Sequence, residues 1–207
     1  MSAPKGIVYI VEDDPSFRKS MERLILASGY EVVACESANS FLGQASIRHP
    51  GCLLLDVQLP DIDGLRLQQK LIEKGIRLPI IFMTGHGTIP MSVQAMKDGA
   101  VDFLPKPFKT KDILSAIVKA HERDAHIVQE DFEKKEIKAL IDTLTPREKE
   151  VLRWVITGRL NKQIAYDLGI TEKTVIVHRS RIMQKTRASS VAELVRLAEK
   201  ADISPAA

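Results

Sequence analysis

The chain has 207 residues, of which 28% are charged, and its formal net charge is +3. This length exceeds one average domain and allows two small ones, each large enough for its own hydrophobic core. Because it contains neither a stretch of 18 apolar residues nor the apolar segment of a signal peptide, we expect a cytoplasmic protein that does not bind a membrane.

Polar side chains follow short apolar segments at four places in the N-terminal half. These are Glu12-Asp13-Asp14 after Ile7–Val11, Asp56 at the end of 52–56, Thr84 after 79–83, and Lys106 after 101–104. Short apolar runs of this kind are typical of buried parallel strands. In open α/β sheets, ligands bind at the carboxyl ends of the strands. We therefore expect these side chains to gather at one edge of a sheet.

Such a cluster of acids suggests a metal and a phosphoryl group. Crowded carboxylates repel one another unless a cation lies among them, and their oxygens suit a hard divalent ion such as Mg²⁺. A carboxylate can also act as the nucleophile that accepts a phosphoryl group. A lysine and a hydroxyl nearby would neutralise and orient the phosphoryl oxygens. One acid would then be the acceptor, and the others would hold the metal.

On these motifs, residues 1–125 resemble the receiver domain of two-component response regulators. The resemblance implies an α/β fold of the flavodoxin/CheY type, with a doubly wound parallel sheet of five strands. It also implies a phosphoacceptor role for Asp56 and an Mg²⁺ site of Asp13, Asp56, the Gln58 carbonyl and, through water, Glu12. Thr84 and Lys106 would bind the phosphoryl group, Phe103 would be the switch aromatic, and the Lys106–Pro107 peptide would be cis. The position of Arg18 favours Glu12-Asp13 as the acidic pair and leaves Asp14 beside it.

Each of these residues also has a simpler structural interpretation. Asp13 or Asp14 before Pro15 could be a helix N-cap, Thr84 beside Gly85 a turn residue, and Lys106 a solvated charge. Phe103 could serve core packing alone. A phosphatase of the haloacid-dehalogenase type is a rival for the whole set, but it needs a second acid two residues after the nucleophile. The chain has Gln58 at that position.

Residues 109–141 contain neither proline nor glycine and predict a helix. Ile113, Ile117 and Ala120 recur at helical spacing, so the first part should pack on the receiver. The second part is mostly charged, and we expect residues 126–142 to be a solvated helical linker. A coiled-coil dimer is an alternative here, although apolar residues do not keep heptad spacing over three heptads.

The two cysteines, Cys35 and Cys52, lie in apolar strands and are expected to be core residues rather than a disulfide or metal pair.

The C-terminal segment is basic. Residues 143–207 contain 12 Lys and Arg against 7 Asp and Glu, whereas residues 1–142 contain 18 against 20. A capping box at Thr145-Pro146-Arg147-Glu148 should begin a helix that stops at Gly158. Helices are then expected at 161–168, ending at Gly169, at 171–185 and at 191–200. Two helices joined by a tight turn, the second long and basic, are the helix-turn-helix pattern, and a basic module indicates a polyanionic partner.

Residues 143–207 resemble the LuxR/NarL-type DNA-binding domain in the segments Leu144-Thr-Pro-Arg-Glu, Asn161-Lys-Gln-Ile-Ala165 and Thr174-Val-Ile-Val-His-Arg179. With the receiver, the whole resembles the FixJ-type response regulators. This implies a separate all-α domain of four helices, with 171–185 as the recognition helix in the major groove of duplex DNA. Lys173, Val177, Ser180 and Arg181 could contact bases, and Lys162, Thr174, His178 and Arg179 could contact phosphates. Ile176 replaces the family's usual lysine, so a thymine methyl is contacted instead, or specificity rests on Arg179 and Arg181, or Ile176 packs against a neighbouring helix.

The resemblance also implies partners and a switch. A sensor histidine kinase would donate the phosphoryl group to Asp56, and phosphorylation would promote a homodimer through the surface near residues 90–101. The dimer would bind a promoter of two-fold symmetry and could contact RNA polymerase. An output domain that binds RNA or protein is the alternative. The receiver would catalyse its own phosphorylation and dephosphorylation alone, so the chain is not expected to be a conventional enzyme.

Overall fold

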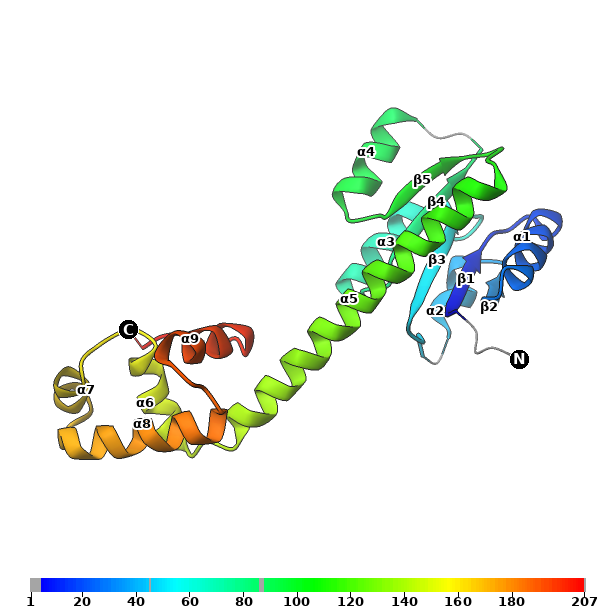
Figure 1. Cartoon of the computed structure of the whole chain (residues 1–207). Helices are drawn as coiled ribbons and strands as arrows, with labels where there is room; N and C mark the ends of the chain where they lie inside the picture. The colour runs from blue at the N-terminus through cyan, green and yellow to red at the C-terminus, as the bar shows by residue number, and fades with distance from the viewer. Residues whose placement is uncertain (1–4, 45, 86–87, 207) are drawn as a thin grey trace. The chain divides into compact units, whose positions relative to one another are not determined.

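The computed structural model describes residues 5–44, 46–85 and 88–206, which form two compact units, residues 1–129 and 130–207 (Figure 1). The elements of the first unit are β1 Ile7–Val11, α1 Pro15–Ala27, β2 Glu31–Cys35, α2 Ala38–Leu42, β3 Gly51–Asp56, α3 Gly64–Glu73, β4 Ile80–Thr84, α4 Ile89–Lys97 and β5 Asp102–Pro105. They are followed by α5 Thr110–Asp142, α6 Pro146–Val155, α7 Asn161–Leu168, α8 Glu172–Thr186 and α9 Val191–Lys200. The elements expected from the sequence are present, with ends that agree or differ by a few residues.

The first unit is built on a five-stranded parallel sheet in the order β2-β1-β3-β4-β5. Successive side chains of β1 point to opposite faces: Tyr9 and Val11 enter one hydrophobic core, and Val8 and Ile10 enter the other. Both faces of the sheet are therefore buried, which explains why its strands are continuous apolar runs. This is the doubly wound α/β fold expected from the sequence.

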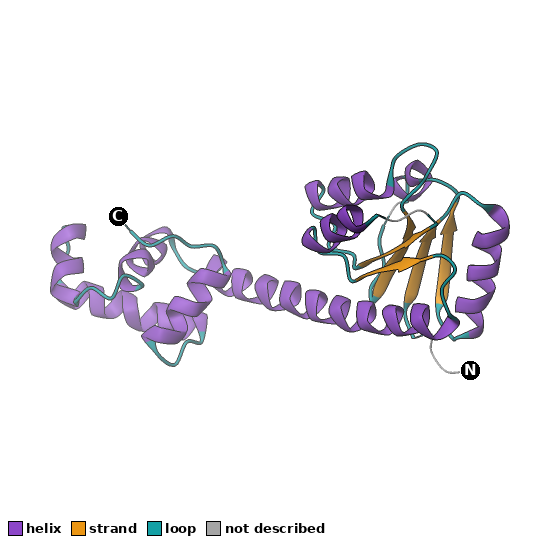
Figure 2. Cartoon of the chain, turned by 90° about the horizontal axis from the view of Figure 1, so that it is seen from above, coloured by secondary structure: helices purple, strands orange, loops and turns teal. Residues whose placement is uncertain are grey.

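Helices cover both faces of the sheet (Figure 2). Phe41 of α2, Leu67 of α3 and Ala95 of α4 pack on one face. Ile25 of α1 and Ile117 of α5 pack on the other. The apolar face predicted for the first part of α5 is thus buried against the sheet. Cys35 and Cys52 are both buried, as expected for core residues.

The strand register determines which side chains meet at the carboxyl edge of the sheet. Val11 pairs with Leu55, so the residues that follow β1 lie beside Asp56. Asp56 in turn pairs with Met83, and Thr84 pairs with Pro105. Parallel strands end at the same edge, and the polar residues after β1, β3, β4 and β5 are therefore neighbours.

The second unit is all-helical around its own core. Thr145 and Glu148 form the predicted capping box at the start of α6, and Gly169 ends α7 in the left-handed conformation at φ 62°. The core brings together Val151 of α6, Ile164 of α7, Val175 of α8 and Leu194 of α9, together with Ile137 and Ile141 from the end of α5. Over the described residues of both units, no helix is long and apolar enough to cross a membrane.

Candidate functional site

Three carboxylates meet at the carboxyl edge of the sheet. Glu12 and Asp13 follow β1, Asp56 ends β3, and one ligand atom of each lies within 4.8 Å of the others. Glu12 is 1% exposed and Asp56 6% exposed, whereas Asp13 faces solvent. Burial raises the pKa of Glu12 above its ordinary value even though a lysine hydrogen bond opposes the rise. The edge therefore concentrates negative charge where water is scarce.

Lys106 joins two of these acids. Its Nζ donates to Glu12 Oε2 at 2.7 Å and to Asp56 Oδ2 at 2.8 Å. Burial alone would lower the pKa of Lys106, but the hydrogen bonds from its ammonium to Asp56 and Glu12 outweigh burial, and the pKa lies above its ordinary value. The ammonium also lies 4.2 Å from the centre of the Phe17 ring. Lys106 is thus a charged group aimed at the acids, rather than the solvated lysine of the simpler interpretation.

Thr84, Gln58 and Phe103 surround this pair. Thr84 is fully buried at the end of β4, and its carbonyl accepts from the Lys106 backbone N–H at 2.7 Å. The Gln58 N–H donates to Asp56 Oδ1 at 3.1 Å. Phe103 is half-buried in β5, with its ring centre 5.9 Å from that of Phe82. The Lys106–Pro107 peptide is cis.

Asp14 has a different use. Its Oδ1 accepts from the N–H groups of Ser16 and Phe17 and caps α1, with Pro15 at the first helical position. The hydrogen bond from Phe17 is the largest reason that the pKa of Asp14 is lowered. Of the two capping alternatives left open by the sequence, Asp14 is the N-cap, and Asp13 belongs to the acidic cluster.

A donor set of three carboxylates fits a divalent cation. Hard oxygen donors at this density are what Mg²⁺ and Ca²⁺ bind. Glu12, Asp13 and Asp56 are the residues that could hold such an ion. The arrangement of acids, lysine and buried hydroxyl suits the binding and transfer of a phosphoryl group.

The second unit presents a basic helix with exposed side chains. On α8, Lys173, Val177, Ser180 and Arg181 are exposed, while Thr174, His178 and Arg179 are partly exposed. Lys162, near the start of α7, is also exposed. Ile176 is 51% exposed, so it does not pack fully against a neighbouring helix. α7 and α8 are joined by the short turn at Gly169, which is the arrangement of a helix-turn-helix.

Comparison with known families decides between the possible interpretations. Residues 8–118 match the response regulator receiver domain, and residues 142–198 match the luxR family of bacterial regulatory proteins. The chain belongs to the two-component response regulators. It is a transcription factor of that family rather than a conventional enzyme. A receiver domain implies a sensor kinase as partner, and a luxR-type helix-turn-helix implies DNA binding.

Similar response regulators cover nearly the full length of the chain. Nodulation protein W of Bradyrhizobium diazoefficiens is 46% identical over 203 residues, which is 98% of this chain and 89% of that protein. The structure of response regulator StyR shares 43% identity and a TM-score of 0.76, covering 95% of this chain and 99% of that one. Full-length FixJ from B. japonicum shares 36% identity and a TM-score of 0.59, covering 97% and 98%. Both matches extend over nearly the full chain, in agreement with a response regulator of the FixJ type.

Three residues of the receiver site had no role assigned from the sequence. The Arg18 guanidinium donates to the carbonyls of Glu12 at 2.6 Å and Asp13 at 3.0 Å, and so orients the acidic loop. The Phe17 ring lies against the Lys106 ammonium. Gly64 starts α3 where an added Cβ would lie 2.3 Å from the Asp56 carbonyl oxygen. Of these three roles, only that of Gly64 had a signal in the sequence, namely the glycine itself, because only a residue without a side chain allows so close a backbone approach.

Proposed function

We propose that the chain accepts a phosphoryl group on Asp56 from a sensor histidine kinase and thereby controls DNA binding by its C-terminal domain. The observation that carries this proposal is the contact of one lysine ammonium with two of the three clustered acids. A structural ion pair needs only one acid per lysine. Because the cluster has three acids and the ammonium contacts only two of them, negative charge is left for a metal ion, with Asp56 beside it as a nucleophile.

Mg²⁺ is the proposed ion. Asp13, Asp56 and the Gln58 carbonyl would bind it directly, and Glu12 would bind it through water. When bound, it would neutralise the carboxylates and the phosphoryl oxygens. The exposure of Asp13 beside the buried Glu12 and Asp56 suits an ion that keeps several of its waters.

Phosphoryl transfer follows from the position of Asp56. One Asp56 carboxylate oxygen forms a bond to phosphorus, and the bond from phosphorus to the kinase histidine nitrogen breaks with its electron pair remaining on nitrogen. Lys106 already donates to Asp56 Oδ2 and would donate to an oxygen of the attached phosphoryl group. The Thr84 hydroxyl would supply a second hydrogen bond. These two donors stabilise the charge that Asp56 gains on phosphorylation.

The proposed switch passes from Thr84 to the surface of α4 and β5. Movement of Thr84 toward the phosphoryl group would make room for Phe103, which packs beside Phe82 and is only half-buried. Phosphorylation would shift the population toward the state with Phe103 turned inward. The size of this shift is set by how much more favourably the phosphoryl group interacts with that state than with the other. On α4, Ile89, Val93 and Met96 are 81%, 47% and 48% exposed, an apolar surface that a second copy of the chain would cover. We propose a homodimer through this surface.

We further propose that α8 enters the major groove of a promoter. Lys173, Val177, Ser180 and Arg181 would face bases, and Lys162, Thr174, His178 and Arg179 would face phosphates, as expected from the sequence. The half-exposed Ile176 is available for a thymine methyl. The Thr174 hydroxyl lies 2.8 Å from that of the cap Thr171, and this hydrogen bond limits its rotation.

The remaining parts of the proposal concern organisation. The receiver would comprise residues 1–125, the linker 126–142 and the DNA-binding domain 143–207, with the end of the linker anchored by Ile137 and Ile141 in the second core. The protein would act in the cytoplasm, where a promoter-bound dimer could contact RNA polymerase.

Acetyl phosphate tests the receiver part. Incubated with Mg²⁺, the full chain should gain one phosphoryl group, and Asp56→Asn should gain none. The matched control, Asp112→Asn, changes an exposed carboxylate in the first turn of α5 and should be labelled normally. Labelling that persists in Asp56→Asn would refute the assignment.

A gel shift with duplex promoter DNA tests the output. Arg181→Ala should weaken specific binding by about 1–3 kcal/mol if Arg181 contacts a base. Arg196→Ala on α9 removes the same charge outside the proposed surface and is the control. An affinity for duplex DNA that does not change with salt concentration, or an affinity that is higher for RNA than for duplex DNA, would favour an output domain that binds RNA or protein.

A further inference from the structure

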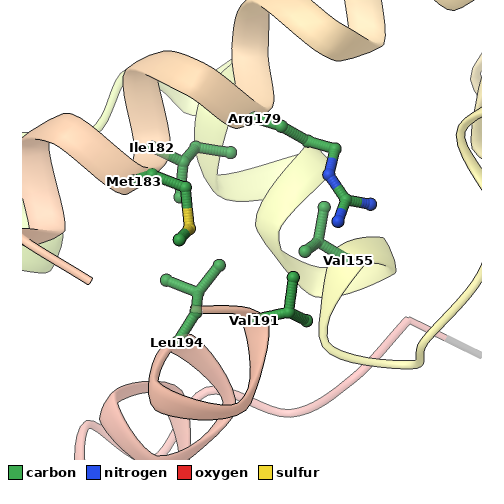
Figure 3. Close-up of a pocket in the computed structure, with 6 residues that line it drawn as sticks. All are labelled: Val155, Arg179, Ile182, Met183, Val191 and Leu194. Carbon is green, nitrogen blue, oxygen red and sulfur yellow. The ribbon is translucent and has the colours of Figure 1, made fainter. Parts of the chain in front are cut away.

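A cavity lies between three helices of the DNA-binding domain (Figure 3). It has a volume of about 190 Å³ and is lined by Val155 of α6, Arg179, Ile182 and Met183 of α8, and Val191 and Leu194 of α9. Five of these six side chains are apolar. Such a lining favours an apolar occupant, since apolar cavities of this size are poor sites for water.

The exception in this lining is Arg179. Figure 3 shows its side chain extending beside Val155, with the guanidinium at one side of the cavity. Within residues 5–44, 46–85 and 88–206, no acceptor is hydrogen-bonded to or ion-paired with this guanidinium. A partly buried cation beside apolar side chains gains strongly from an anionic partner.

A second hollow adjoins the cavity and shares Val155, Arg179 and Val191 with it. It has a volume of about 380 Å³ and adds Arg159 among its lining residues. Arg159 already pairs with Asp167, and its guanidinium lies 4.5 Å from the centre of the Trp154 ring. Arg179 is therefore the cation at the junction whose charge is not compensated within the described residues, and the open hollow gives a ligand access to it.

We propose that this cavity binds a small monocarboxylate with a compact apolar body, of the size of an aromatic acid. A cavity of about 150 Å³ lined by aliphatic side chains can hold benzene, so the present volume is sufficient for one ring. A guanidinium pairs with a carboxylate through two parallel hydrogen bonds, which a neutral ligand cannot reproduce. Binding at this site does not depend on the proposed DNA contacts.

Occupation of the cavity has a consequence that rests on the proposed function. Arg179 is one of the residues proposed to contact DNA phosphate. A carboxylate paired with its guanidinium would remove that contact, and each lost phosphate contact lowers the salt dependence of DNA binding by about one unit of slope. The ligand would thus weaken DNA binding without touching the receiver.

Methyl NMR of the full chain tests the site, with sodium benzoate as the probe and benzamide as its neutral counterpart at matched ionic strength. Benzoate should shift the methyl resonances of Val155, Ile182, Val191 and Leu194 in a saturable titration, with an affinity in the millimolar range usual for so small a ligand. Benzamide should bind at least about tenfold more weakly. Absence of saturable shifts, or equal affinity for both probes, would overturn the proposal.

Two variants locate the binding. Arg179→Gln removes the charge, and Val191→Phe places a larger side chain in the lining at a position that is 36% exposed. Each should reduce benzoate affinity by about tenfold or more. Arg196→Gln, also on α9 but outside the lining, is the control and should bind benzoate as the parent does. Retained affinity in both Arg179→Gln and Val191→Phe would refute the site.

A salt titration of duplex DNA binding separates this proposal from the proposed function. Saturating benzoate should lower the affinity of the parent, and Arg179→Gln should be insensitive to benzoate. Duplex binding that is unchanged by benzoate, while the methyl shifts saturate, would overturn the coupling and leave the ligand site. Failure of the unliganded chain to bind duplex DNA would instead count against the proposed function.

Discussion

Replacing Lys106 with Met should destabilise the metal-free receiver by about 3 kcal/mol. Lys106 Nζ lies 2.7 Å from Glu12 and 2.8 Å from Asp56, and the three side chains are 18%, 1% and 8% exposed. Removing one partner of a buried ion pair typically costs 3–5 kcal/mol, because the remaining charge is left without compensation. We expect the lower end of this range, since the ammonium keeps some contact with solvent.

Magnesium should reverse the effect of this substitution. With the ammonium gone, Glu12 and Asp56 can be compensated only by protonation or by the bound ion. Lys106→Met should therefore bind Mg²⁺ more tightly than the parent, and saturating Mg²⁺ should restore most of the lost stability. Met keeps an unbranched apolar side chain at this position but lacks the ammonium, which lies 4.2 Å from the centre of the Phe17 ring, so the loss reports on the charge of Lys106, including this contact.

Calorimetric unfolding with and without Mg²⁺ measures both quantities. A loss of about 3 kcal/mol corresponds to a decrease of roughly 10 °C in the receiver transition. Lys111→Met, an exposed lysine on α5, is the control and should change stability by less than about 0.5 kcal/mol. Trp154, the single tryptophan, lies in the second unit, and its fluorescence transition should not move. An unchanged receiver transition, or weaker Mg²⁺ binding by Lys106→Met, would refute the reasoning.

Three further outcomes follow from the structure. The hydrogen bond from Lys185 is the main reason that the pKa of Glu148 falls from 4.5 to about 2. Ionised Glu148 therefore contributes to the stability of the second unit above pH 4.5, and this contribution is lost as the pH falls toward 2. With allowance for screening at Lys185, Glu148→Gln should lower the unfolding free energy of the second unit by about 2 kcal/mol at pH 7. The stability of this variant, followed by Trp154 fluorescence, should also decrease less steeply than that of the parent as the pH falls. A decrease as steep as the parent's would contradict this. Asp124→Ala should lower the unfolding free energy of the receiver by about 1–3 kcal/mol, because the buried Gly51 N–H loses the carboxylate that accepts its hydrogen bond at 2.8 Å. An unchanged transition temperature in calorimetry would show that this hydrogen bond is dispensable. Gly64→Ala should weaken Mg²⁺ binding in a calorimetric titration, since the new Cβ would lie 2.3 Å from the Asp56 carbonyl oxygen and the loop must move; parent-like affinity would argue against a tight loop.

Much of the fold follows from the sequence because its signals are local and strong. The apolar run of β1 and the capping box at Thr145 predict their elements, since each depends on residues only a few positions apart. The gathering of acids at one edge was also predictable, because parallel strands share their carboxyl edge. Which acid of Glu12-Asp13-Asp14 caps α1 was not predictable, since it depends on side-chain rotamers at the start of the helix.

Contacts between distant residues had no comparable signal. Asp124 of α5 accepts from His49 at 2.7 Å across 75 positions of the chain, and neither residue belongs to a recognisable motif. The partnership of Lys106 with both Glu12 and Asp56 likewise depends on where β5 ends in three dimensions. The cavity beside Arg179 arises from the packing of α6, α8 and α9, which no sequence period encodes.

A crystal structure with Mg²⁺ and beryllofluoride, a stable mimic of the phosphoryl group, tests the central claim most directly. We predict beryllium bonded to an Asp56 carboxylate oxygen, Lys106 and Thr84 donating to the fluorides, and Mg²⁺ bound by Asp13, Asp56 and the Gln58 carbonyl. Beryllofluoride on another residue, or Mg²⁺ outside the acidic cluster, would contradict the account.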